Sequence, residues 1–254
     1  MQFRVLGCSG GLGTGGHTTT FALGRRVLID AGTGVGRLSL DDMQALEHVF
    51  LTHAHLDHIA GLAFLADTRF AHGATGLRVH ARASVLGALR AHIFNWQIWP
   101  DFASLGCEHK ATIETRRVHM GRPVVIDDAV LTPLPARHTV PACGYAVECA
   151  GGTLVYSGDT TACGPFWRAL NKLERLDHLI IEVAYSDEQE RLGKVARHYT
   201  PAVLGQELRK LRHRPVIHIT HHKPGRGALI EAQCAEALAG WDFRHLRLDD
   251  VIDL

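Results

Sequence analysis

Three histidines and one aspartate fall close together in the stretch LTHAHLDHIAGL, as His53, His55, Asp57 and His58. The preceding run, HVFLT, is typical of a strand, in which alternate side chains point the same way. His53 and His55 can therefore converge on one ion. Asp57 and His58 follow where the chain turns into a predicted helix, and they can serve a second ion beside the first. The spacing predicts ligands for two neighbouring metal ions.

Two histidines do not complete a catalytic metal site, because such a site commonly takes three protein ligands and a water. Three later segments place a suitable side chain where an apolar strand meets a polar loop. These are His138 in PARHT, Asp159 in VYSGDT and His221 in IHITHHK. The two carboxylate oxygens of Asp159 allow it to bridge two ions. His218 and His222 compete with His221, but strand spacing points them away from it or beside it.

The elements that must position these ligands are short apolar runs bounded by glycine and turn residues, with the lengths of strands. The runs are FRVLG, TTFAL, RRVLIDAG, HVFLTH, LRVHA, AVLTPLPA, GYAVECA, GTLVYSGD, HLIIEVA and PVIHITHH. Segments with helical spacing lie at 57–71, 200–213 and 227–240. This mixture, without a repeat or a low-complexity linker, predicts one α/β domain over residues 1–254, with sheets inside and helices outside.

The composition narrows the class of protein. Apolar residues make up 46% and charged residues 21%, and no apolar stretch approaches the ~20 residues that a bilayer span needs. The six cysteines form no CxxC pair, which argues against a disulfide framework or a thiolate zinc site. The net charge is +1, so a duplex nucleic-acid binder is not expected. The segment MQFRVLGCSGG lacks the apolar region of a secretory signal, and we expect a cytoplasmic protein.

The motif HAHLDH resembles the H-x-H-x-D-H motif of the metallo-β-lactamase superfamily, and the later candidate ligands fall on that family's ligand strands. The resemblance covers nearly the whole chain. It implies a four-layer αββα sandwich with the metal site at one edge of the β-sandwich. It assigns His53, His55 and His138 to the first ion, Asp57, His58 and His221 to the second, and Asp159 to both. Two divalent ions are implied; zinc is expected first, and manganese or iron suits the same ligands.

A narrower resemblance concerns the class II cyclic-nucleotide phosphodiesterases. The similar segments are HLDHIAGL at 55–62, AHIFNWQIWPDF at 91–102, IIEV at 180–183, RHYTP at 197–201 and ITHHKP at 219–224. The signature departs from that family at Ala63, Phe64 and Asp67. The resemblance implies hydrolysis of cyclic AMP or cyclic GMP, a small anionic phosphodiester, by a hydroxide bridging the two ions. A homodimer is expected on the same basis.

Two residues outside the ligand set are candidates for moving a proton. His198 is the candidate acid for the departing 3′ oxygen, and Glu182 would hold its ring. The pairing resembles the Glu and His of related tRNA 3′-processing endonucleases. A helix-capping surface histidine is the alternative for His198. Asp57, which the resemblance assigns to the second ion, is the third predicted catalytic residue.

Substrate binding is predicted for the aromatic segment and one lysine. Phe94, Trp96 and Trp99 could stack on a nucleobase, because every base has an aromatic face. Asn95 could hydrogen-bond the base, and Lys223 could neutralise phosphate. Core packing or a dimer contact is at least as compatible with each ring, and a solvated strand end is as compatible with the lysine.

Other functions and loops are weighed against this hypothesis. A tRNA 3′-processing endonuclease shares most ligands, but the near-neutral charge and the lack of a visible inserted arm disfavour it. A lactonase or thioesterase could use the same ions, whereas the complete ligand set disfavours a scaffold without catalysis. GCSGGLGTGG, residues 7–16, lacks the lysine of a P-loop and predicts a tight loop near the metals. Asp30 in LIDAGTG is predicted to be structural.

Overall fold

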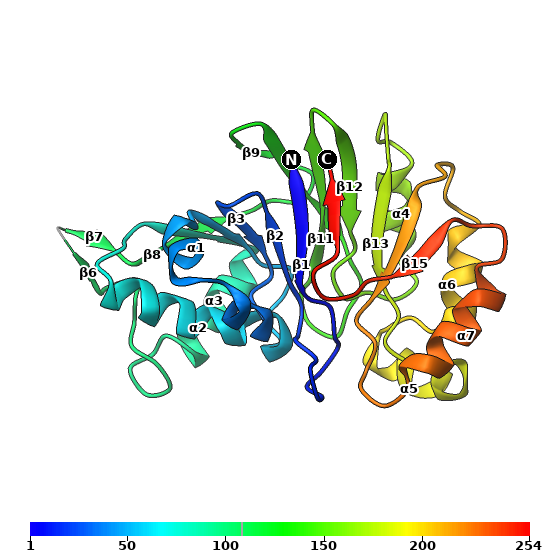
Figure 1. Ribbon diagram of the computed structural model, residues 1–254, viewed down its shortest axis with the longest axis horizontal. Coiled ribbons are helices and arrows are strands. Elements are labelled where there is room, and N and C mark those ends of the chain that lie inside the picture. The colour runs from blue at the N-terminus through cyan, green and yellow to red at the C-terminus, as the bar shows by residue number, and fades with distance from the viewer. Residues whose placement is uncertain (108) are drawn as a thin grey trace.

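The computed structural model describes residues 1–107 and 109–254. Two seven-stranded sheets form the centre of the molecule, and helices cover their outer faces (Figure 1). A two-stranded hairpin of β6 (Gly106–Cys107) and β7 (Lys110–Ala111) stands apart from both sheets. The predicted four-layer αββα sandwich is confirmed.

The first sheet follows the order β16 (Val251–Asp253), β1 (Gln2–Gly7), β2 (Thr20–Leu23), β3 (Val27–Ile29), β4 (His48–Phe50), β5 (Leu77–Ala81) and β8 (Ile113–Arg117). Strands from β16 to β3 pair antiparallel, and those from β3 to β8 pair parallel. Parallel neighbours end at the same edge of a sheet, so β4 delivers its following residues beside the end of β3.

The second sheet repeats this plan. Its order is β15 (Phe243–His245), β14 (Val216–Thr220), β13 (His178–Glu182), β12 (Gly152–Tyr156), β11 (Cys143–Cys149), β10 (Ala129–Pro135) and β9 (Val124–Ile126). Strands from β9 to β12 are antiparallel, and those from β12 to β15 are parallel. The chain therefore leaves β12, β13 and β14 at one common edge.

The helices fall into two outer layers (Figure 1). Beside the first sheet lie η1 (Thr33–Arg37), α1 (Leu40–Ala45), α2 (Leu56–Ala71) and α3 (Ala83–His92). Beside the second lie α4 (Gly164–Leu170), η2 (Asp187–Gln189), α5 (Glu190–Ala196), α6 (Pro201–Leu208) and α7 (Gly227–Ala237). The three predicted helices correspond to α2, α6 and α7, although α6 ends five residues before the predicted end at 213. Among the described residues, no helix is both long and apolar enough to cross a membrane.

Three apolar clusters fill the three spaces between the four layers. Strand alternation decides which cluster each side chain joins. In β4 and the residue after it, Val49 and Leu51 pack under the helices of the first layer, whereas Phe50 points between the sheets. In β12, Val155 packs under the second helical layer and Tyr156 points between the sheets. The strands are thus buried on both faces, and this holds the loops at their ends in fixed positions.

Candidate metal centre

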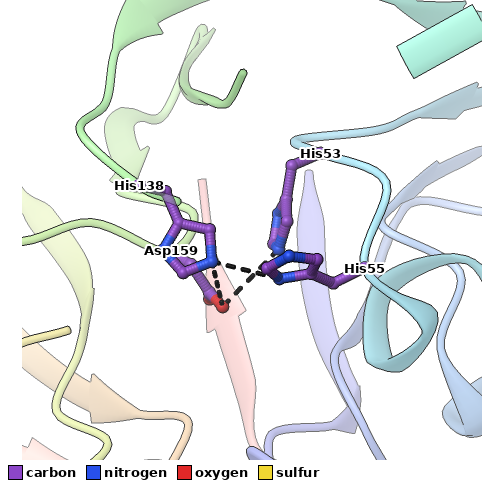
Figure 2. Close-up of side chains that lie close together, drawn as sticks. All are labelled: His53, His55, His138 and Asp159. Atoms are coloured by element: carbon purple, nitrogen blue, oxygen red, sulfur yellow. Dashed lines mark hydrogen bonds and ion pairs between the residues drawn. The ribbon is translucent and has the colours of Figure 1, made fainter. Parts of the chain in front are cut away.

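The seven predicted ligands meet at one edge of the β-sandwich, each just after a strand or at the start of a helix. They form two groups, and within each group the potential ligand atoms lie within 4.8 Å of one another. The first group consists of His53, His55, His138 and Asp159 (Figure 2). The second group consists of Asp57, His58, Asp159 and His221. Asp159 belongs to both.

Distances around Asp159 match a bridging position. Its Oδ1 lies 3.3 Å from His58 Nε2, and its Oδ2 lies 3.2 Å from His221 Nε2. The same Oδ2 lies 3.6 Å from His53 Nε2 and 3.9 Å from His138 Nε2. The carboxylate therefore faces imidazoles of both groups, as the sequence predicts for a shared ligand.

Several buried nitrogen and oxygen atoms of this centre lack a partner and would be stabilised by bound cations. Within the described residues, His53 Nε2, His58 Nε2, His221 Nε2 and Asp159 Oδ1 are buried and have no hydrogen-bond partner. An unpaired buried polar group costs about 1–3 kcal/mol, so four at one point would be unfavourable without a ligand. Imidazole nitrogens and carboxylate oxygens are donors that suit divalent transition metals. The residues present therefore fit such ions.

Asp30 orients two of the ligands from behind. It is fully buried and accepts a hydrogen bond from His58 Nδ1 at 2.7 Å. It also accepts from the Thr52 hydroxyl at 2.8 Å. Because that hydroxyl donates to Asp30, its oxygen accepts from His53 Nδ1 at 3.0 Å. In their neutral, metal-binding form both imidazoles then present Nε2 to the centre, which is the usual arrangement behind metal-binding histidines.

The sequence identified Asp30 only as structural. Its position one residue after β3, which pairs in parallel with the ligand-bearing β4, was the signal that could have revealed this role. Two further residues behind ligands were also missed. Arg197 O accepts from His138 Nδ1 at 3.2 Å, and Thr19 Oγ1 lies 3.3 Å from His221 Nδ1.

The glycine-rich segment 7–16 packs directly against the last ligand strand. Cys8 O accepts from His221 N at 2.8 Å, and Gly10 N donates to His222 O at 3.0 Å. A Cβ at Gly10 would lie 2.4 Å from His221 O, so only glycine fits this approach. The predicted tight loop near the metals is confirmed. The loop supports the left-handed backbone of His221, whose φ is 68°.

The pKa values of His53, His138 and Asp159 are shifted towards the protonation states that bind a metal. Burial lowers the pKa of His53 well below its ordinary value, and the neighbouring His58 lowers it further. Burial also lowers the pKa of His138 to about 4. Both imidazoles are therefore neutral near pH 7, the form that binds a metal. Burial opposes the charge of Asp159, but His221 and His58 outweigh it and hold the pKa of this carboxyl well below its usual range.

His198 and Glu182 lie beside the first group, as a proton-donating pair requires. His198 Nδ1 donates to Glu182 Oε1 at 2.8 Å, and the His198 ring centroid lies 4.8 Å from that of His138. Burial lowers the pKa of His198, but the Glu182 carboxylate outweighs it and the net pKa is raised. The buried Glu182 also accepts from Thr160 N at 3.1 Å. This pair is thereby tied to the residue after Asp159.

The aromatic segment packs against α2 and the core of the first layer. Phe94 is only 7% exposed and packs against Phe102 in the core, so its burial does not support stacking on a base. The Trp99 ring packs edge-on against Phe64 of α2, with centroids 5.5 Å apart. Trp96 is 63% exposed and is the ring of this segment that remains available for stacking.

Asn95 builds the turn that carries Trp96. Its Oδ1 accepts from Gln97 N at 3.0 Å and Ile98 N at 2.8 Å, and its Nδ2 donates to Ala91 O at 3.0 Å. A hydrogen bond from Asn95 to a nucleobase would compete with these local bonds.

Lys223 lies at the second group of ligands. Its Nζ donates to Gly10 O and is 3.5 Å from Asp57 Oδ2.

The two histidines that the sequence offered as alternatives to His221 have partners elsewhere. His218 Nε2 lies 3.2 Å from His178 Nδ1. His222 Nε2 lies 3.0 Å from His245 Nδ1.

Comparison with known families agrees with this geometry. The family described as "Beta-lactamase superfamily domain" matches residues 25–238. The chain belongs to the metallo-β-lactamase superfamily. It is a hydrolase of this superfamily, whose fold implies divalent metal ions, and the two His/Asp groups are the residues that can hold them.

Relatives of this superfamily member include a probable cyclic-nucleotide phosphodiesterase and a ribonuclease. It is 30% identical to a probable 3′,5′-cyclic-nucleotide phosphodiesterase of Yersinia pestis over 188 residues, 66% of this chain and 52% of that protein. It is also 30% identical to ribonuclease Z of Phocaeicola vulgatus over 155 residues, 57% of this chain and 47% of that protein. The chain thus spans about half the length of these relatives. Among solved structures, unliganded yeast PDE1 superimposes with a TM-score of 0.80 at 16% identity, covering 98% of each chain.

Proposed function

We propose that this chain is a dinuclear-metal phosphodiesterase that hydrolyses 3′,5′-cyclic nucleotides. The observation that carries the proposal is the shared Asp159, whose two oxygens face both ligand groups while the His198–Glu182 pair lies alongside. The likeness to a probable 3′,5′-cyclic-nucleotide phosphodiesterase supports the choice of substrate. The substrate would be a small anionic phosphodiester.

The ions would supply the nucleophile and the charge stabilisation. Two divalent ions, zinc by preference and manganese or iron otherwise, would lower the pKa of a water and offset negative charge on the phosphoryl oxygens. The protein contributes orientation. Asp57 Oδ2 lies 3.7 Å from His221 Nε2, so Asp57 adds a carboxylate to the second group beside that of Asp159. Lys223, held next to Asp57, would balance charge on the phosphate.

His198 would protonate the departing 3′ oxygen. Glu182 raises the net pKa of His198 against the effect of burial, so the imidazole keeps a proton to donate near neutral pH. The Nδ1 proton is held by Glu182, which leaves Nε2 as the atom that would donate. Trp96, the exposed ring of the aromatic segment, would stack on the base, with Trp99 and Asn95 fixing the turn that carries it.

A ribonuclease Z-type endonuclease is the second candidate. The observation that favours it is a 27% identity to ribonuclease Z of Mycolicibacterium paratuberculosis over 248 residues, 90% of this chain and 86% of that protein. Such an enzyme would cleave a phosphodiester with the same centre, so only the substrate distinguishes the two candidates. The homodimer and the cytoplasmic location expected from the sequence remain predictions.

A substrate panel tests the proposal. The purified protein, loaded with zinc or manganese, is assayed with cyclic AMP, cyclic GMP, bis-p-nitrophenyl phosphate, a precursor tRNA and a lactone. We expect turnover of a cyclic nucleotide and of the chromogenic diester, and none in Asp159→Ala. Cleavage of the precursor tRNA without turnover of cyclic nucleotides would replace the leading candidate by the second. Turnover of the lactone alone would refute both.

A further inference from the structure

Arg197 adopts an unusual backbone conformation next to the centre. It ends helix α5 with φ 56° and ψ 52°, in the left-handed region. For a residue with a side chain this conformation costs roughly 1–2 kcal/mol, and glycine or asparagine is the usual choice at such a helix end. The backbone conformation therefore does not explain why an exposed arginine occupies this position.

Both ends of Arg197 hold His138. The main-chain oxygen of Arg197 accepts from His138 Nδ1 at 3.2 Å. The guanidinium Nη1 donates to the main-chain oxygen of His138 at 2.5 Å. Because a carbonyl can only accept, the first bond fixes the proton of His138 on Nδ1 and leaves Nε2 for the centre, where it lies 3.1 Å from His55 Nδ1. The second bond fixes the loop that carries the ring.

The residues after Arg197 hold the predicted acid. His198 Nδ1 donates to Glu182 Oε1 at 2.8 Å, and Tyr199 N donates to Glu182 Oε2 at 3.3 Å. Glu182 also accepts from Thr160 N, next to Asp159. One short segment therefore sets the positions of a metal ligand and of the acid, and its only direct side-chain link to the ligand loop among these bonds is the guanidinium of Arg197.

We infer that Arg197 is a positioning residue for both ion binding and proton transfer. Its carbonyl selects the tautomer of His138, and its guanidinium fixes the distance between the His138 loop and the His198 segment. The effect on ion binding follows from the ligand geometry alone. The effect on turnover rests on the proposed function.

Three substitutions distinguish the role of the Arg197 guanidinium from that of its left-handed backbone. Arg197→Asn keeps a residue that tolerates the left-handed conformation but removes the guanidinium. Arg197→Lys keeps one charged donor for the single bond to His138 O and should rescue the loss. Lys194→Asn, an equivalent change of an exposed cation on the same helix α5, is the matched control.

Cobalt binding is the first readout, since it needs no substrate. Each purified protein is stripped of metal and titrated with Co²⁺, followed by visible absorption. Arg197→Asn keeps the carbonyl that accepts from His138 Nδ1 and removes only the bond that holds the His138 loop, so the loss should fall near the lower end of the about 10–100-fold range for partners behind ligands. We expect at least a tenfold loss in Arg197→Asn, recovery of most of it in Arg197→Lys, and none in Lys194→Asn, with unchanged melting temperatures. Parental cobalt affinity and spectrum in Arg197→Asn would overturn the inference and leave Arg197 as a helix end only.

Turnover of bis-p-nitrophenyl phosphate and of cyclic AMP is the second readout. At saturating metal we expect Arg197→Asn to lower kcat with little change in KM, because the residue positions groups and does not bind substrate. A raised KM with parental kcat would contradict a positioning role. If no protein in the series hydrolyses a cyclic nucleotide, the proposed function fails, while the cobalt titration still decides the role of Arg197.

Discussion

Asp30 Oδ2 accepts a hydrogen bond from His58 Nδ1 at 2.7 Å, and both residues are completely buried. Asp30 reaches His53 as well, through the hydroxyl of Thr52. One carboxylate, directly after β3, therefore orients a ligand of each group. Its partners are otherwise donors, namely Thr52 N, the Thr52 hydroxyl and the Tyr156 hydroxyl.

Replacing Asp30 by asparagine should weaken both metal groups. The amide NH₂ would face donors, and His58 Nδ1 would lose its charged acceptor. We expect a loss of about 10–100-fold in metal affinity, measured by metal content after dialysis against a graded chelator, together with a lower melting temperature. Asp41→Asn, on the exposed start of α1, is the control. Parental metal retention in Asp30→Asn would show that the carboxylate does not tune the ligands.

Asp159→Ala and His221→Ala should lose different numbers of ions. Asp159 belongs to both groups, whereas His221 belongs to the second. Elemental analysis after gel filtration should find both ions depleted in Asp159→Ala. In His221→Ala the ion of the first group should remain. Full retention of both ions in Asp159→Ala would reject its bridging role.

The structure brings the seven predicted ligands together because each follows a strand end or opens a helix, and strand ends are readable from apolar runs. The sequence could not predict the residues behind them. Asp30 acts across parallel strands, and Arg197 acts through a left-handed turn, so neither role has a local pattern. For the aromatic segment the sequence left stacking and core packing open. The structure places the Phe94 ring in the core against Phe102.

The role of His198 can be tested through the leaving group. An alkoxide needs a proton from an acid, whereas p-nitrophenolate leaves without one. We expect His198→Gln to lower kcat for cyclic AMP by roughly 10²–10⁴-fold and to lower kcat for bis-p-nitrophenyl phosphate much less. Equal losses on the two substrates would mean that His198 supports the centre structurally and is not the acid.

Two buried histidines outside the ligand set, His80 and His218, should make the fold sensitive to acid. Arg78 Nη1 donates to His48 Nε2 at 3.2 Å, so His48 Nδ1 carries its proton and donates to His80 Nε2 at 2.8 Å. Burial, with His48 adding to it, lowers the pKa of His80 to about 3. Burial and His178 likewise lower the pKa of His218 to about 3. Neither imidazole of these two can be protonated in the fold near neutral pH.

The sign of the pH effect follows from these lowered values. An unfolded histidine has a pKa of about 6.5, so below this pH the unfolded chain binds more protons than the folded one. The free energy of unfolding is therefore unaffected by these two histidines above pH 6.5 and falls progressively as the pH drops towards 3. At pH 5, the lowered pKa of each of His80 and His218 should reduce the free energy of unfolding by about 2 kcal/mol relative to neutral pH.

Urea unfolding at pH 7.5 and pH 5, for the parent and His80→Gln, measures this contribution. Glutamine can still accept the hydrogen bond from His48 but does not titrate. The ligand histidines titrate in both proteins, so their effect cancels in the comparison. We expect the parent to lose about 2 kcal/mol more stability than His80→Gln between the two pH values. Equal losses would mean that His80 gains access to a proton without global unfolding, through a local opening at β4 and β5.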